Sequence, residues 1–336
     1  MQRRELLRVL SVAGALLALP AGVDSGPDQL PRTVPAEPGN VQEYEDLNAH
    51  LWQVFGLTRP KRLLYPLVRD QLAVLVDRLH LARSAVEHRQ LCVLSCELFQ
   101  LAGEIFFDAD RYTDAAYCYS LAASAGREAR SFDRWACALT RQAFVNLYDR
   151  QYGRAASVLD VAGRIARHGD SQLSTRQWVA AVQAQAFAGL GDRDACERAL
   201  ETAEQVRDLN SSVNPGGWLR FDGGRLAEER GSCYLALGQI GLAERTLLAA
   251  DDGAMSLRRR GGLLTDLASL AARRQDIDRV IEYAGEAVGI AEQTRSTGYL
   301  GRKMQDFQSQ LTPNLLGEAQ IARLAERITG LRTAVA

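Results

Sequence analysis

The segment 224–250 constrains the fold most, because it pairs two short amphipathic helices around one tight turn and the same design recurs about five times in 336 residues. Its first half spaces apolar and small residues at i, i+4 and i+7, which is the spacing of one buried helical face. Those residues are Ala227, Gly231 and Tyr234. Small side chains at Gly231 and Ala243 let the two helices approach closely. The sequence therefore predicts stacked helical hairpins.

Five such units can be aligned, over residues 96–126, 136–167, 177–206, 224–250 and 261–292. When Ala115, Ala155, Ala195, Ala243 and Val280 are taken as equivalent, the steps between units are 40, 40, 48 and 37 residues. The turn of the third unit then looks one residue short. Small and aromatic residues at these offsets resemble the tetratricopeptide (TPR) repeat, whose usual period is about 34 residues. We predict an all-α fold, a TPR-like α-solenoid of about five helix pairs with extra capping helices.

The rest of the chain divides around these repeats. Residues 23–40 are rich in proline without helical periodicity and read as a linker. We expect N-terminal capping helices over 41–90, TPR-like repeats over 91–296, and C-terminal capping helices over 297–336. Terminal repeats need such caps because their apolar faces would otherwise be exposed.

Residues 1–22 leave two interpretations open. Arg3 and Arg4 precede an apolar run from Leu6 to Leu19, which resembles a twin-arginine export signal. The same residues also suit a short apolar helix that packs on the domain or on a partner helix. The run is too short for a stable membrane span. We expect a cytoplasmic protein, with export through the twin-arginine pathway as the alternative.

No catalytic, cofactor or metal motif is present, so we expect neither an enzyme nor a cofactor-binding protein. The sequence lacks a nucleophile elbow, a phosphate-binding loop and a paired metal-ligand motif. His80 and His88 lie two helical turns apart and are expected to face solvent. The six cysteines lie within helical segments and are expected to be buried, reduced thiols.

The segment 208–223 interrupts the repeats, since Pro215 cannot continue a helix. Trp218 and Phe221 follow at once. Two interpretations stand: a surface loop held down by these two aromatic residues, or a loop that closes one end of a binding groove.

The first helices of successive TPR units line a concave surface, and the repeat register assigns its inner positions. This candidate groove consists of Glu97, Gln100, Glu104, Thr140, Phe144, Gln185, Arg225, Glu228, Ser232, Thr265, Ser269 and Arg273. The groove is acidic in its first unit and carries single arginines later. Such a face suits a peptide or protein partner held by hydrogen bonds and a few charges. A solvated face without a ligand is the alternative, and the sequence also leaves a homodimer open.

Three stretches together resemble the helix-turn-helix/TPR transcriptional regulators of high-GC bacteria. They are the opening RRELLRVLSVAG, the proline-rich link, and WLRFDGGRLAEERGSCYLALG at 218–238. The resemblance implies a sensor module in transcriptional regulation. Residues 1–336 contain no helix-turn-helix motif, and the net charge of −1 gives no electrostatic reason to expect phosphate binding. We therefore expect no direct contact between this chain and nucleic acid.

Overall fold

Five helix pairs form the body of the protein, and they confirm the predicted all-α, TPR-like solenoid. The computed structural model describes residues 41–209, 217–251 and 255–333, which form fifteen α-helices and no strand. The pairs are α4 (Ala85–Asp108) with α5 (Tyr112–Glu128), α6 (Phe132–Tyr148) with α7 (Tyr152–Ala166), α8 (Thr175–Leu190) with α9 (Arg193–Glu204), α10 (Gly223–Ala236) with α11 (Ile240–Ala250), and α12 (Leu257–Arg273) with α13 (Ile277–Thr294). Residues 1–22 and the linker at 23–40 lie outside the described residues.

The same corner joins the two helices of every pair. One residue with positive φ ends each first helix: Asp110, Arg150, Gly191, Gly238 and Gln275. The next backbone N–H donates to the carbonyl five residues earlier, as Arg111 does to Phe106 at 2.9 Å. This is the Schellman arrangement, which satisfies the free carbonyls at a helix end. Its repetition gives each hairpin the same sharp reversal.

These corners correct the register of the third pair. In the first, second, fourth and fifth pairs, the first fully buried inner residue is the fourth residue of the second helix, such as Ala115 in α5. The fourth residue of α9 is Cys196, which has no exposed surface, whereas Ala195 retains 7%. Cys196 is therefore the equivalent position, and the turn itself has the common length.

Small residues at helix crossings allow the close approach that the sequence predicted. A Cβ atom added at Gly231 would lie 2.6 Å from Cγ of Leu247, which is fully buried. At Gly103 the same atom would overlap the ring of Tyr119. Both glycines thus set the distance between the helices of their pair.

Gly231→Val is expected to lower the free energy of unfolding by about 3 kcal/mol, because the added atoms must displace the fully buried Leu247. Gly285→Ala is the matched control, since its Cβ would meet no atom within 4 Å. It should stabilise the protein by about 0.5–1 kcal/mol through helix propensity. Urea unfolding followed by circular dichroism measures both changes. Equal effects at the two glycines would contradict the close approach at Gly231.

Additional helices cover both ends of the array. At the start, α2 (Val41–Leu57), the 3-10 turn η1 (Lys61–Leu64) and α3 (Tyr65–Leu81) share one core with α4 and α5. At the end, the π-helical turn η3 (Thr297–Gly301), α14 (Arg302–Gln308), α15 (Pro313–Leu316) and α16 (Ala319–Thr333) share a core with α12 and α13. The last apolar face of the repeats is thereby buried.

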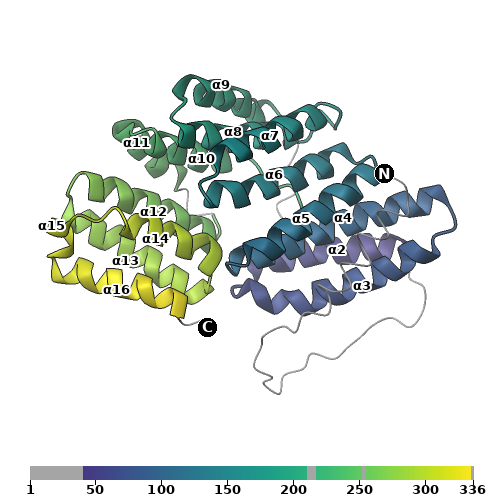
Figure 1. Cartoon of the computed structure of the whole chain (residues 1–336), viewed down its shortest axis with the longest axis horizontal. Helices are drawn as coiled ribbons and strands as arrows, with labels where there is room; N and C mark the ends of the chain where they lie inside the picture. The colour runs from purple at the N-terminus through teal and green to yellow at the C-terminus, as the bar shows by residue number, and fades with distance from the viewer. Residues whose placement is uncertain (1–40, 210–216, 252–254, 334–336) are drawn as a thin grey trace, which may run out of the picture.

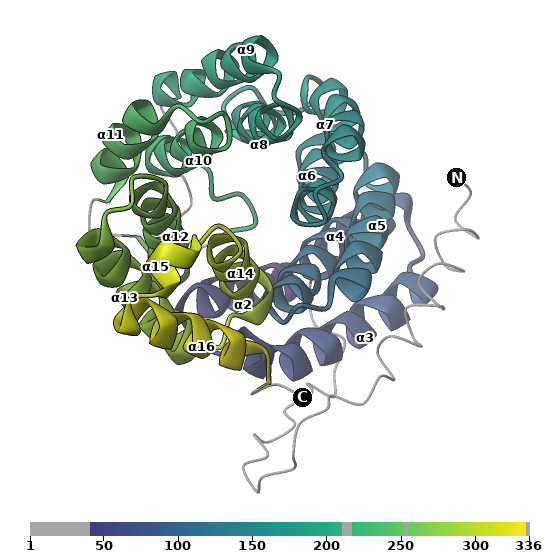
Figure 2. The same ribbon diagram turned by 60° about the vertical axis from the view of Figure 1, so that its left-hand side comes forward.

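The array curls until its end meets its beginning, so that the solenoid forms a ring (Figures 1 and 2). The closing contact joins the α4–α5 corner (Asp108, Asp110 and Tyr112) to Arg258, Ser296, Gly298 and Arg302. Tyr112 donates its hydroxyl to the carbonyl of Gly298 at 2.6 Å, and Arg258 pairs with Asp108 at 2.8 Å. The first helices of the pairs face the interior of the ring, and their partners form the outside.

The six cysteines are free and buried, as predicted. The prediction for His88 is wrong: it is 9% exposed and lies 3.8 Å from Glu128, whereas His80 is exposed. The two histidines do not share a helix, since His80 lies in α3 and His88 in α4, and His88 is covered because it faces Glu128 of α5. Among the described helices, α4 alone is long and apolar enough to cross a membrane. Since 83% of its apolar window is buried, it acts here as the central core helix.

Candidate functional site

One cavity of about 210 Å³ opens into the ring interior, between the second, third and fourth pairs and the segment η3–α14. We call η3 and α14 the closing helices, because they follow the last pair and η3 contacts the α4–α5 corner. Its walls come from α6, α7, α8, α10, η3 and α14. They are formed by Phe144, Leu147, Tyr148, Tyr152, Gln185, Ala188, Gly189, Arg225, Glu229, Ser232, Cys233, Ala236, Tyr299, Lys303 and Asp306. Cavities of about 150 Å³ already accommodate benzene, so this volume suits one large side chain of a ligand.

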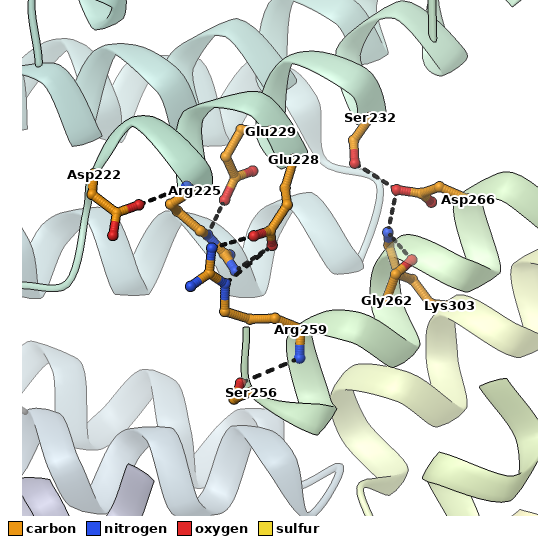
Figure 3. Close-up of polar contacts among 10 residues, drawn as sticks. All are labelled: Asp222, Arg225, Glu228, Glu229, Ser232, Ser256, Arg259, Gly262, Asp266 and Lys303. Carbon is orange, nitrogen blue, oxygen red and sulfur yellow. Dashed lines mark hydrogen bonds and ion pairs between the residues drawn. The ribbon is translucent and has the colours of Figure 1, made fainter. Parts of the chain in front are cut away.

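The polar wall of the cavity is built on α10. Asp222 caps this helix by accepting from the backbone N–H of Arg225 at 2.7 Å, and the Arg225 side chain reaches Glu229 at 2.7 Å and Glu228 at 3.4 Å (Figure 3). Arg259 of α12 forms a second ion pair with Glu228. Burial raises the pKa of the Glu229 carboxyl, although Arg225 opposes the shift. Glu229 is therefore a shielded carboxyl group at the cavity wall.

A second polar group joins α10 to the closing helices. Lys303 of α14 donates to Asp266 at 2.5 Å and to the carbonyl of Gly262 at 3.1 Å. Ser232 of α10 donates to the same carboxylate at 2.6 Å (Figure 3). These contacts fix the position of α14, and Lys303 and Ser232 both line the cavity.

Aromatic side chains line the same cavity beside these charged groups. The rings of Tyr148 and Tyr299 lie 6.1 Å apart, and Phe144 packs 6.5 Å from Trp178. Tyr299 also lies beneath the guanidinium of Arg258 at 4.1 Å. Aromatic rings beside paired charges favour a ligand that is itself partly apolar and partly polar.

The structure divides the twelve predicted groove residues into groups. Phe144, Gln185, Arg225 and Ser232 line the cavity. Glu97, Gln100, Glu104 and Glu228 instead make contacts between helices, with Arg134, Arg141 or Arg259 as partners. Thr140, Thr265 and Ser269 are buried and donate to carbonyls of their own helices at 2.7–3.0 Å. Arg273 is exposed and donates to the carbonyl of Leu235 at 2.8 Å.

Sequence reasoning missed the residues that the closing helices bring to the cavity, namely Tyr299, Lys303 and Asp306. A signal was present, because Lys61 and Lys303 are the only two lysines of the chain. Lys303 lines the cavity, and Lys61 lies at the closing contact near Asp108, where it donates to the carbonyl of Phe55. Glu229 was also missed, although its neighbour Glu228 was predicted.

The loop after residue 216 connects the interior to the capping helices. Phe221 is fully buried, and the carbonyl of Trp218 accepts from Arg141 at 2.6 Å. Arg220 lies over the rings of Trp52 and Phe55 of α2. Phe221 and Trp218 pack against the core and hold down the described part of this segment, as the first interpretation expects. That the segment closes one end of a binding groove stays a prediction.

In the described part of the chain, no three His, Cys, Asp or Glu side chains form a group that could hold a metal ion. Each charged side chain that lines the cavity forms an ion pair. Arg225 pairs with Glu229 inside the lining, whereas Lys303 pairs with Asp266 and Asp306 with Arg150, at 2.5 Å each, outside it. The cavity thus offers paired charges and aromatic surface to a ligand.

No protein-family model and no curated protein matches this sequence. Among solved structures, the chain is similar to a Rap protein that was crystallised in complex with competence and sporulation factor. The two share 12% sequence identity with a TM-score of 0.54, over 88% of this chain and 99% of that one. At this identity the likeness concerns the fold, and it supports the TPR-like architecture.

Proposed function

We propose that this protein is a regulatory module that binds a peptide inside its ring. The observation that carries the proposal is the cavity, which brings aromatic rings and paired charges together within the concave face of a TPR-like array. Helical arrays of this kind present extended concave binding surfaces. The Rap protein that resembles this chain was solved with a bound factor, which supports the same mode of binding here.

We propose from the sequence that the regulated process is transcription. The stretches at 1–12 and 218–238 resemble helix-turn-helix/TPR transcriptional regulators, so we place the module in transcriptional control, with the peptide as its signal. Its effect on DNA would then pass through a partner rather than through residues 41–333, in which we identify no DNA-binding motif.

Ala236→Trp is expected to abolish peptide binding, because the indole would fill the cavity from an exposed position at the end of α10. Binding of a random-sequence synthetic peptide library, read by affinity selection and mass spectrometry, measures the effect. Ala249→Trp places the same side chain on an exposed position of α11 and should bind as the unmodified protein does. Equal capture by both variants would show that the cavity is not the binding site, and no capture by the unmodified protein would reject the function.

We also propose a cytoplasmic location. The intact mass of the protein from fractionated native cells tests this directly. A cytoplasmic mass that retains residues 1–22 supports the regulatory module. Cleavage near Ala21, with the product found outside the cytoplasm, would support an exported TPR scaffold with a twin-arginine signal instead.

A further inference from the structure

Four cations converge where the ring interior meets the capping helices. This cation cluster consists of Lys61, Arg141, Arg220 and Arg258. The two carboxylates nearest to it are already engaged. Asp108 pairs with Arg258 at 2.8 Å, and Glu104 lies 3.4 Å from Arg141 and accepts the hydroxyl of Tyr119 at 3.0 Å. Four positive charges thus face two negative ones, which leaves an excess of positive charge.

Arg220 carries that excess. Within residues 41–209, 217–251 and 255–333 it forms no ion pair and no side-chain hydrogen bond. Its guanidinium lies over the rings of Trp52 and Phe55, at 5.1 and 5.4 Å from their centroids. Burial lowers the pKa of Arg220 to about 10; the nearby Glu104 carboxylate opposes this shift, and Arg141 and Arg258 add to it. A guanidinium in such surroundings is costly unless an anion completes its environment.

The cluster is continuous with the cavity. Arg258 lies 4.1 Å above the ring of Tyr299, which lines the cavity. Arg141 lies 4.8 Å above Trp178, whose ring packs against the cavity residue Phe144. Arg141 also lies 5.4 Å from the ring of Trp52, over which Arg220 lies, so the side chains that border the cavity reach the surroundings of Arg220.

We propose that Arg220 binds a carboxylate of the peptide ligand, with Lys61, Arg141 and Arg258 supplying the surrounding positive potential. Arg141 already donates to Gln100 at 2.6 Å and to Trp218, so its role is to shape the field rather than to bind. The planar guanidinium of Arg220 has free donors that match a carboxylate in a bidentate geometry. This inference rests on the proposed function and names the chemistry of its ligand. The carboxylate is either the C-terminus of the peptide or an Asp or Glu side chain.

Arg220→Met tests the inference, because the inference predicts that this variant is more stable without ligand but binds peptide more weakly. Without ligand, the variant should melt about 2–4 °C higher, since a partly buried charge that forms no ion pair has been replaced by an apolar chain. With peptides selected by the unmodified protein from the random library, the dissociation constant should rise at least tenfold. Arg220→Lys should recover part of this affinity, and Arg245→Gln, on the exposed face of α11, should change neither quantity.

The library is used in two forms, with free and with amidated C-termini. Loss of capture on amidation identifies the terminal carboxylate, whereas retained capture with enrichment of Asp or Glu identifies a side chain. Capture that is indifferent to both, together with an unchanged affinity in Arg220→Met, would overturn the inference and leave the proposed function standing. A lower melting temperature of the unliganded variant would also overturn it, because Arg220 would then be a structural group. Failure of the unmodified protein to capture any peptide would reject the proposed function, and this inference with it.

Discussion

Gly298→Ala is expected to open the ring. A Cβ atom at this position would overlap the backbone carbonyl oxygen of Phe107 and would lie 2.6 Å from the amide nitrogen of Asp110. Both atoms belong to the α4–α5 corner, so neither can move aside as a flexible side chain would. The methyl group must separate η3 from this corner, and the hydrogen bond from Tyr112 to the carbonyl of Gly298 would break with it.

We expect this single methyl group to lower the free energy of unfolding by about 3 kcal/mol, at the upper end of overpacking effects. Small-angle X-ray scattering should show a larger radius of gyration, because the two ends of the array are then free to separate. Hydrogen exchange should accelerate at the backbone of 107–112 and 296–302.

Gly289→Ala on α13 is the matched control, since its Cβ would meet no atom within 4 Å. It should leave the scattering curve unchanged and stabilise the protein slightly. An unchanged radius of gyration in Gly298→Ala would mean that the ring is not closed in solution.

The helix pairs could be predicted from the sequence because the information is local. Gly231 and Leu247 lie within one hairpin, and the spacing of this small and this large residue predicts that the two helices pack closely. The left-handed corner was partly visible in the same way, since Gly191 and Gly238 favour positive φ. Asp110 also tolerates this conformation, whereas at Arg150 and Gln275 the residue type does not signal it.

Closure of the ring could not be predicted, because it depends on the sum of many small rotations between repeats. Each interface fixes only the orientation of two adjacent repeats. A small change in the rotation between repeats would therefore add up along the array and move Gly298 far from Phe107. The contact spans almost the whole repeat array, and Tyr112 and Gly298 are separated by 186 positions. No spacing rule connects residues so distant in sequence.

The candidate site could be predicted only in part for the same reason. The repeat register assigned Arg225 and Ser232 to the inner face, and both line the cavity. It also selected Thr140 and Ser269, which are covered because adjacent inner helices pack against each other. Tyr299 and Lys303 reach the cavity through the closing helices, and that wall exists only because the ring closes.

Asp108→Ala is expected to lower the free energy of unfolding by about 3 kcal/mol, because it removes the charge that compensates a buried guanidinium at the closing contact. Asp108 is 3% exposed and accepts from Arg258 at 2.8 Å and from Ser296 at 2.6 Å. Its loss leaves Arg258 with only the more distant Glu104 as a counter-charge. Urea unfolding measures the change.

A double-mutant cycle separates the charge from the packing at this contact. Removing the guanidinium as well, in Asp108→Ala/Arg258→Met, should restore about 1–2 kcal/mol, since no uncompensated charge then remains. Asp114→Ala is the control. It breaks a partly exposed ion pair between Asp114, in the first turn of α5, and Arg111, which is the N-cap residue of that helix, and should lower the free energy of unfolding by less than about 1 kcal/mol. If the double variant were as unstable as the sum of its single variants, Asp108 and Arg258 would not be coupled. The ring would then be held by the backbone contact at Gly298 rather than by charge.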